Sequence, residues 1–147
     1  MIPCTIRDLE DLSEIATKCI GDKGTLWVRE QLYHPLNKLF LFSDTLFVQV
    51  EATGIYKYSI HTIGNTKDIR GYRDFTIKMG SWMMENTPCT CLIAFAASSN
   101  KRMQRFIGLT GGERVGVIPD AGGHEDEVMY VFPKRNKETL EGRIRCQ

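Results

Sequence analysis

The apolar residues in the first third of the chain recur with the period of a helix. Within 8–20 they fall at every third or fourth position, which places them along one face of an α-helix. Asp8 is a suitable N-cap for this helix, and Gly21 is suited to end it. A second helix is predicted over 25–33, ending ahead of Pro35, because proline disfavours helical backbone in the residue before it.

The segments that flank these helices have the pattern of β-strands. Residues 3–7 are predicted to form a short first strand. After the second helix, the apolar residues recur with a period of two, and aromatic and β-branched residues are frequent. This pattern predicts strands at 38–43, 46–52 and 55–63. Short turn sequences separate these three strands, so we expect an antiparallel meander.

Helices and strands alternate in the second half of the chain. A nearly continuous apolar run at 89–97 predicts a buried central strand. The other predicted elements are helices at 67–85 and 101–109 and strands at 113–118 and 127–132. The order β-α-α-β-β-β-α-β-α-β-β predicts a mixed α/β (α+β) fold with a mostly antiparallel central sheet flanked by helices. The charged tail 134–147 is expected to be a short helix or frayed.

Length and charge narrow the classes of function. The chain has 147 residues, which fits a single domain over 1–147. Its 19 Lys and Arg against 18 Asp and Glu give a net charge of +1, so we expect no nucleic acid and no membrane as partner. The sequence has neither an apolar run of about 20 residues nor the pattern of a signal peptide, which predicts a cytoplasmic protein.

The five cysteines do not indicate a metal site. Cys89 and Cys91 form the one close pair, whereas a zinc site usually has C-x2-C spacing and a second pair of ligands. On a strand the two side chains share one face, where cysteine behaves as a small hydrophobic residue. No metal is therefore predicted, and no spacing indicates a catalytic Cys.

Two local motifs resemble those of a known family. Arg70-Gly71-Tyr72-Arg73 is similar to the phosphate loop, Arg/Gln-x-x-Gly-x-Gly/Ala, of the GNAT superfamily of acetyl-CoA-dependent N-acetyltransferases. Asn100-x-x-Met103-x-x-Phe106 is similar to the Asn-led helix behind the central strand of that family. The order and lengths of the predicted elements resemble the family over nearly the whole chain. The resemblance implies a GNAT-like acyl-CoA N-acyltransferase fold and transfer of an acetyl group to an amine.

The sequence departs from the family pattern at several positions. Arg73 and Phe75 stand where the phosphate loop usually has small residues, and Ile107 stands where a Tyr often acts as general acid. In these departures the chain resembles short, divergent GNAT-like proteins of bacteriophages, some of which are virion components. The alternative prediction is therefore a catalytically inactive phage protein of this fold. It would be a virion component or a module that binds or inhibits another protein, in the host cytoplasm or the virion.

The resemblance implies a coenzyme A site built largely from backbone. The pyrophosphate would bind N–H groups at the start of the helix at 67–85, where Arg70, Gly71, Tyr72 and Arg73 lie. Gly71 allows close approach of the backbone, and the arginines add charge-assisted contacts. The alternative is that these residues form a solvated helix face.

The pantetheine arm in this family lies between two parallel strands, which here would be 56–63 and 90–97. Ile63, at the end of the first strand, and Asn100, after the second, are therefore predicted to bind the cofactor. Asn100 is equally suited to cap the helix that follows it, with Ser98 or Ser99 as competing caps.

The family draws its general base from the meander strands, where Glu51, His61 and Tyr58 are candidates. The resemblance implies Glu51 as a catalytic residue, because the base in the family is often a Glu acting directly or through water. His61 is predicted as the other, because histidine suits general-base catalysis and it lies near the cofactor end of its strand. A surface or structural role is the alternative for each. The expected partner is an amine acceptor, either a small molecule or a protein, which no motif specifies. A homodimer formed through an exposed edge strand is a further expectation.

Overall fold

The computed structural model describes residues 1–136 of the chain. Its α-helices are α1 (Leu9–Ile20), α2 (Gly24–Tyr33), α3 (Ile69–Asn86) and α4 (Lys101–Leu109). Its strands are β1 (Lys38–Ser43), β2 (Leu46–Ala52), β3 (Lys57–Gly64), β4 (Cys91–Ala97), β5 (Glu113–Ile118) and β6 (Glu127–Pro133). Three 3₁₀ turns, η1 (Ile6–Asp8), η2 (Gly21–Lys23) and η3 (Lys134–Asn136), complete the described elements. The tail predicted as a short helix or frayed, 134–147, includes η3 at its start, and 137–147 lie outside the described residues.

The periodicity of the sequence predicts most of these elements. Four predicted segments, 38–43, 46–52, 101–109 and 113–118, coincide with β1, β2, α4 and β5. Apart from the strand at 3–7, the remaining predicted helices and strands are confirmed with boundaries that move by one or two residues.

The predicted first strand at 3–7 is wrong. The Thr5 backbone N–H donates to the Asp8 carboxylate at 2.7 Å, and the Thr5 hydroxyl accepts the Arg7 N–H at 3.3 Å. This reciprocal capping box starts the turn η1 and removes the Thr5 N–H from any strand ladder. Pro3 offers no N–H at all. The segment still contacts the sheet region, where the Cys4 N–H donates to the Leu39 carbonyl at 2.7 Å.

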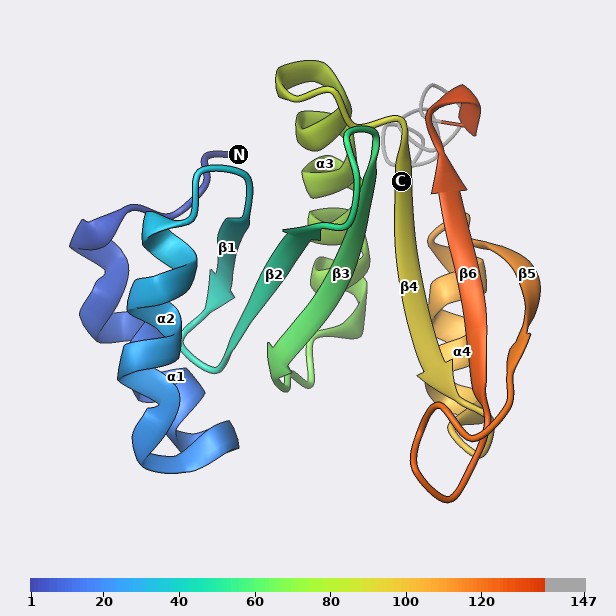
Figure 1. Cartoon of the computed structure of the whole chain (residues 1–147), viewed down its shortest axis with the longest axis horizontal. Helices are drawn as coiled ribbons and strands as arrows, with labels where there is room; N and C mark the ends of the chain where they lie inside the picture. Colours follow the sequence, from blue (N-terminus) through green and yellow to red (C-terminus); the bar gives the residue numbers. More distant parts are fainter. Residues whose placement is uncertain (137–147) are drawn as a thin grey trace. The chain divides into compact units, whose positions relative to one another are not determined.

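The six strands of the described chain form one mixed sheet in the order β1-β2-β3-β4-β6-β5 (Figure 1). The pairs β1–β2, β4–β6 and β5–β6 are antiparallel. Strand β3 is parallel to β4, with Lys57–Ser59 in register with Cys91–Ile93. The predicted mixed, mostly antiparallel sheet flanked by helices is thereby confirmed.

The chain divides into two compact units. Unit 1 consists of Met1–Ala52 and Ile60–Tyr72, and unit 2 of Thr53–Ser59 and the described residues from Arg73 onward. Both β3 and α3 therefore contribute residues to each unit.

In unit 1, helices α1 and α2 cover one face of the β1–β2 hairpin. Their core cluster consists of Leu12, Ile15, Ala16, Val28, Leu39 and Phe47, all at most 3% exposed. The two helices approach closely at Gly24, because a Cβ there would lie 2.6 Å from the Thr17 backbone nitrogen. Glycine is thus required for this helix contact.

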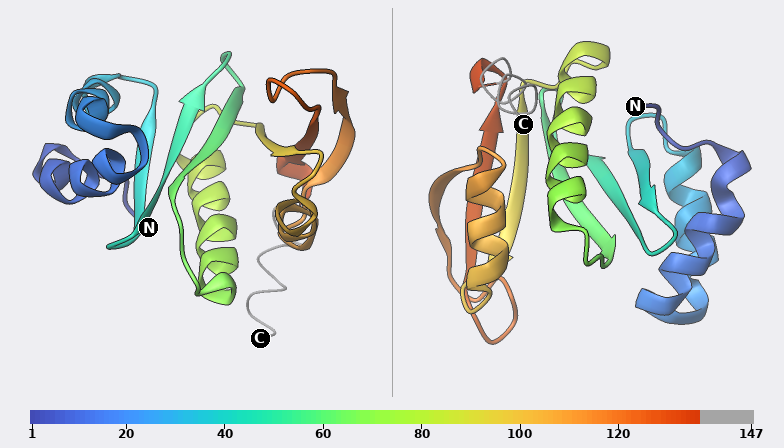
Figure 2. Two further views of the ribbon diagram at one scale, coloured as in Figure 1. Left: turned by 90° about the horizontal axis from the view of Figure 1, so that it is seen from below. Right: turned by 180° about the vertical axis from the view of Figure 1, so that it is seen from behind.

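In unit 2, α4 packs on one face of the β4–β6 pair, as both views in Figure 2 show. Ala94 and Ala96 of β4 and Val128 and Tyr130 of β6 face Ile107 of the helix. The continuous apolar run of β4 is explained by this position, since β4 has a strand on each side and a helix over it.

The end of β3 is joined tightly to the turn between β1 and β2. Gly64 has φ +97°, and a Cβ at this position would overlap the Thr45 carbonyl oxygen. Asn65 N–H donates to that same carbonyl at 3.2 Å, and the Thr45 hydroxyl donates to the Asn65 carbonyl at 2.8 Å. The contact determines where β3 ends and where the segment leading to α3 begins.

Gly64→Ala is expected to lower the free energy of unfolding by more than about 2 kcal/mol, because it combines an unfavourable φ with overlap on a backbone oxygen. Chemical denaturation measures the change. Gly108→Ala is the matched control. A Cβ there meets nothing within 4 Å, so this change in α4 should stabilise by up to about 1 kcal/mol. Equal effects of the two substitutions would contradict the close contact at Gly64.

Candidate functional site

The start of α3 is the first candidate region and lies in unit 1. Thr66 Oγ1 accepts the Asp68 N–H at 3.1 Å, and Asp68 Oδ1 accepts the Gly71 N–H at 2.9 Å. The Tyr72 N–H donates to the Asp68 carbonyl at 3.0 Å. Asp68 therefore caps the helix with its own carboxylate, which is favoured by the positive end of the helix dipole.

This helix start has features of a phosphate site, with one obstacle. Gly71 has no side chain and is half-buried, and the nearby residues Lys67 and Arg70 are exposed cations. The space a Cβ would occupy at Gly71 is filled by the Asp68 carboxylate. The Gly71 N–H would become available to an anion only after the Asp68 side chain turned away.

Tyr72 uses its side chain inside unit 1. The ring is 5% exposed and lies 5.5 Å from the Phe42 ring, centroid to centroid. Its hydroxyl is 2.6 Å from the Thr62 hydroxyl. Burial raises the pKa of the Tyr72 phenol, and the hydrogen bond to Thr62 opposes part of that rise. Tyr72 thus connects the first turn of α3 to β1 and β3, while its predicted contact with a cofactor stays a prediction.

Arg73 is the next residue of the helix and belongs to unit 2. Its Nη2 lies 3.6 Å from Asp74 Oδ1, with about three quarters of each side chain buried. The Arg73 Nε and the Asp74 Oδ1 are buried and have no hydrogen-bond partner among the described residues. A buried guanidinium nitrogen without a partner is costly, so Arg73 has a donor that an added acceptor would satisfy.

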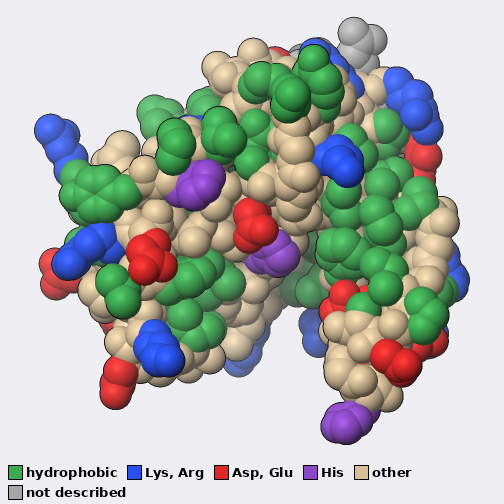
Figure 3. Space-filling view, in the orientation of Figure 1, with side chains coloured by type: hydrophobic (Ala, Val, Ile, Leu, Met, Phe, Trp, Pro, Cys, Tyr) green, Lys and Arg blue, Asp and Glu red, His purple; other side chains and the backbone are tan. Residues whose placement is uncertain are grey.

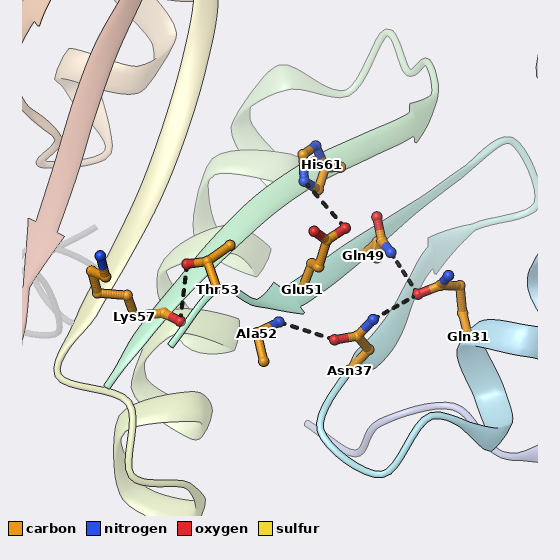
Figure 4. A network of polar contacts seen from close by, with 8 residues as sticks. All are labelled: Gln31, Asn37, Gln49, Glu51, Ala52, Thr53, Lys57 and His61. Atoms are coloured by element: carbon orange, nitrogen blue, oxygen red, sulfur yellow. Dashed lines mark hydrogen bonds and ion pairs between the residues drawn. The ribbon is translucent and has the colours of Figure 1, made fainter. Parts of the chain in front are cut away.

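Glu51 and His61, predicted as catalytic residues, are brought together in unit 1 (Figure 4). Glu51 Oε2 lies 3.9 Å from His61 Nε2, and the side chains are 45% and 43% exposed. They come from β2 and β3 and are accessible to solvent, as a general base must be to meet an acceptor. The third candidate, Tyr58, is 3% exposed and is therefore poorly placed for that role.

The two remaining predicted cofactor residues have structural roles of their own. Ile63 is half-buried and packs against the core cluster of unit 1. Asn100 Oδ1 accepts the Met103 N–H at 3.0 Å, so the helix-capping interpretation of Asn100 is confirmed. The competing cap Ser99 instead donates to Glu125 Oε1 at 3.0 Å. Contacts of Ile63 and Asn100 with a cofactor stay predictions.

The sequence analysis missed a network of side-chain amides next to Glu51. Gln31 Oε1 accepts hydrogen bonds from Gln49 Nε2 at 2.6 Å and from Asn37 Nδ2 at 2.9 Å. Asn37 Oδ1 in turn accepts the Ala52 N–H at 2.9 Å. One signal was available, because Gln49 is the single polar residue in the apolar run Leu46–Val50.

Within 1–136, no group of three or more His, Cys, Asp and Glu side chains is arranged to hold a metal ion. None of the helices in that part of the chain is both long and apolar enough to cross a bilayer.

Hydrophobic side chains gather over β4, β6 and β5 in unit 2 (Figure 3). On the edge strand β5, Val115, Val117 and Ile118 are 53%, 45% and 37% exposed. An exposed apolar edge is consistent with the predicted homodimer, which stays a prediction.

Solved structures show which fold this is. No family model and no curated protein sequence matches the chain. A variant of spermidine N-acetyltransferase SpeG from Vibrio cholerae matches with a TM-score of 0.75 at 9% identity, over 92% of this chain and 95% of that one. Aminoglycoside 6'-acetyltransferase type Ii matches with 0.71 at 14% identity, over 91% and 97%. A GNAT-family acetyltransferase from Bacillus cereus matches with 0.68 at 18% identity, over 90% and 95%.

These likenesses extend over nearly the full length of the chain and of each neighbour. At identities this low they show the fold alone. The expected GNAT acetyltransferase fold is therefore confirmed, while activity, cofactor and acceptor need their own tests.

Burial makes Cys89 a poor nucleophile. The side chain is 0% exposed, and desolvation raises the pKa of its thiol to about 11. At pH 8 about one thiol in a thousand is then ionised. We expect iodoacetamide to label exposed Cys19 in the folded protein and to leave Cys89 unmodified, as read by peptide mass mapping.

The same shift gives a pH dependence of stability. The folded protein holds the Cys89 proton more tightly than the unfolded chain, whose thiol has a pKa of 9.0. The contribution of this thiol to stability is therefore complete below pH 9 and is lost as the pH rises toward about 11.

Labelling of Cys89 as fast as Cys19 at pH 8 would contradict the burial of Cys89.

Proposed function

We propose that the protein binds acetyl-CoA and transfers its acetyl group to an amine. The observation that carries the proposal is the start of α3, where exposed Lys67 and Arg70 stand next to the Gly71 N–H, which the Asp68 carboxylate accepts, on the fold of N-acetyltransferases. Lys67, Arg70 and the Gly71 N–H would hold phosphate groups by charge and by backbone donation. When bound, acetyl-CoA supplies the acetyl group as an activated thioester.

The chain itself must supply proton transfer. An amine acceptor arrives mostly protonated at neutral pH and must lose protons to become a nucleophile and then an amide. Glu51 is the group we assign to take the proton, because its carboxylate is accessible and stands 3.9 Å from His61 Nε2. His61 stabilises that carboxylate and can pass the proton on to solvent. The ammonium loses two protons on its way to the amide, and the thiol product takes up one of them. The other passes to solvent, so one proton is released per turnover.

One observation favours the alternative, a protein of this fold without catalysis. Asp68 places a carboxylate where a cofactor phosphate would bind. If that side chain stays in place, the site repels phosphate. A binding module, a phage origin and a location in the host cytoplasm or virion belong to this alternative, and cofactor binding decides between the two.

Calorimetric titration with acetyl-CoA and with coenzyme A tests the cofactor site. We expect saturable binding by the wild-type protein and a 10- to 100-fold weaker affinity for Arg70→Ala, as about 1.5–3 kcal/mol of charge-assisted contact is lost. Gly71→Glu should abolish binding, because its side chain would overlap the Asp68 carboxylate and add negative charge. Asp68→Asn should bind more tightly than wild type, since asparagine still caps the helix without the negative charge.

Arg29→Ala is the control for the arginine variant, because Arg29 is an exposed arginine on α2. Thermal melting of each variant separates loss of binding from loss of fold. Absence of binding in both the wild type and Asp68→Asn at millimolar cofactor would exclude the enzyme and leave the fold standing.

Substitution of the proposed base should reduce turnover without changing cofactor binding. We expect Glu51→Gln to lower kcat by about 10²- to 10⁴-fold in a free-thiol assay, because the proton acceptor is lost. His61→Gln should cause a smaller loss, since it removes the partner of the carboxylate. Glu10→Gln, an exposed glutamate on α1, is the control. A Glu51→Gln enzyme with full kcat would require a different base.

A further inference from the structure

The amide network beside Glu51 has a fixed direction. It joins Gln31 of α2, Asn37 ahead of β1 and Gln49 of β2, all within unit 1 (Figure 4). A backbone N–H can only donate, so the Asn37 atom that meets the Ala52 N–H must be its oxygen. Asn37 therefore presents its NH₂ to Gln31, Gln31 presents its oxygen, and Gln49 presents its NH₂ to that oxygen.

This direction determines which amide atoms of the network, here called the leftover atoms, have no hydrogen-bond partner. Within the described residues, Gln49 Oε1 and Gln31 Nε2 make no hydrogen bond to another side chain or to the backbone. Figure 4 shows both atoms on the side of the network turned away from Asn37. Gln49 is 4% exposed and Asn37 8%, but neither leftover atom is among the fully buried side-chain atoms that lack a partner, so both keep access to a ligand.

The leftover atoms lie on the same face of β2 as Glu51. Residues 49 and 51 are two apart on one strand, so their side chains leave the same face about 6.7 Å apart along it. A ligand amine at the Glu51 carboxylate therefore has Gln49 Oε1 and Gln31 Nε2 within reach of a group a few bonds away. That pair of atoms offers one acceptor and one donor, and neither atom is charged.

We propose that Gln49 and Gln31 form the acceptor-recognition site and select an amine that carries a neutral hydroxyl or carboxamide group. Such a group donates to Gln49 Oε1 and accepts from Gln31 Nε2, which satisfies both leftover atoms. A second ammonium cannot accept from Gln31, and a carboxylate cannot donate to Gln49. Either charge would also lose water in a site that provides no opposite charge at that point. This inference rests on the proposed acetyl transfer.

A series of primary amines of similar length tests the selection. The probes are aminobutanol, pentylamine, diaminobutane and aminobutyrate, assayed with acetyl-CoA by release of free thiol. We expect the highest kcat/KM for aminobutanol, at least tenfold above each of the others, because a buried hydrogen-bonding pair discriminates strongly against a group that leaves it unpaired. Equal kcat/KM for aminobutanol and pentylamine would overturn the proposal.

Gln49→Met locates the preference in the network. It keeps the length of the side chain and removes both polar atoms, so kcat/KM for aminobutanol should fall to the level of pentylamine, mainly through KM, while pentylamine stays within about twofold. Gln104→Met is the matched control, since Gln104 of α4 binds the Ala97 and Ser98 carbonyls in unit 2. Gln31→Met makes the same test from half-buried Gln31 if Gln49→Met does not fold.

Gln49→Glu supplies the opposite test. A carboxylate in place of the amide offers charge to a second ammonium, so the preference should move from aminobutanol toward diaminobutane. Equal losses for all four amines in the Gln49 variants would show that Gln49 is structural and would overturn the recognition site while acetyl transfer stands. If wild-type protein binds no acetyl-CoA, the proposed function fails, and this inference fails with it.

Discussion

The packing of Gly64 against the Thr45 carbonyl is the constraint on which unit 1 depends. The Thr45 carbonyl oxygen, in the turn after β1, lies against Gly64 at the end of β3. The same oxygen accepts the Asn65 N–H. No side chain fits between the turn and the end of β3, so the two segments form one corner of the unit. This corner determines where β3 stops, and the residues that cap and open α3 follow within a few positions. His61 lies upstream of it on β3, so both candidate regions depend on how this strand ends.

The periodicity of apolar residues predicts the elements whose environment is uniform along their length. Strands 38–43 and 46–52 and helix 101–109 have the predicted bounds, because turn residues or a capping asparagine mark their ends in the sequence. Apolar periodicity does not predict the structure where local polar hydrogen bonds override it. Thr5 and Asp8 close a turn where the sequence predicts a strand. Strand β3 starts at Lys57, because the Thr53 N–H bonds to the Lys57 carbonyl and widens the turn ahead of it.

The candidate site is predictable to a different degree. Glu51 and His61 can be named from residue type and strand position, and the structure brings them to 3.9 Å. The capping role of Asp68 is a local interaction that the motif at 70–73 does not indicate, because Asp68 lies just outside that motif. The amide network could not be derived, since it joins three elements whose pairing appears in the folded chain alone. Its members Gln31 and Gln49 are 18 residues apart.

The bond from the Ala52 N–H to Asn37 has a consequence for the ageing of the protein. Asparagine is one of the thermolabile residues, and hydrolysis of its side-chain amide replaces the NH₂ with a second oxygen. At Asn37 the new carboxylate would still accept the Ala52 N–H, but its other oxygen would face the Gln31 oxygen. Gln31 would have to rotate its amide, and the reversal would pass to Gln49. Replacement of this one nitrogen by oxygen would thus leave the fold unchanged and reverse the donor and acceptor roles in the Gln31 and Gln49 amides.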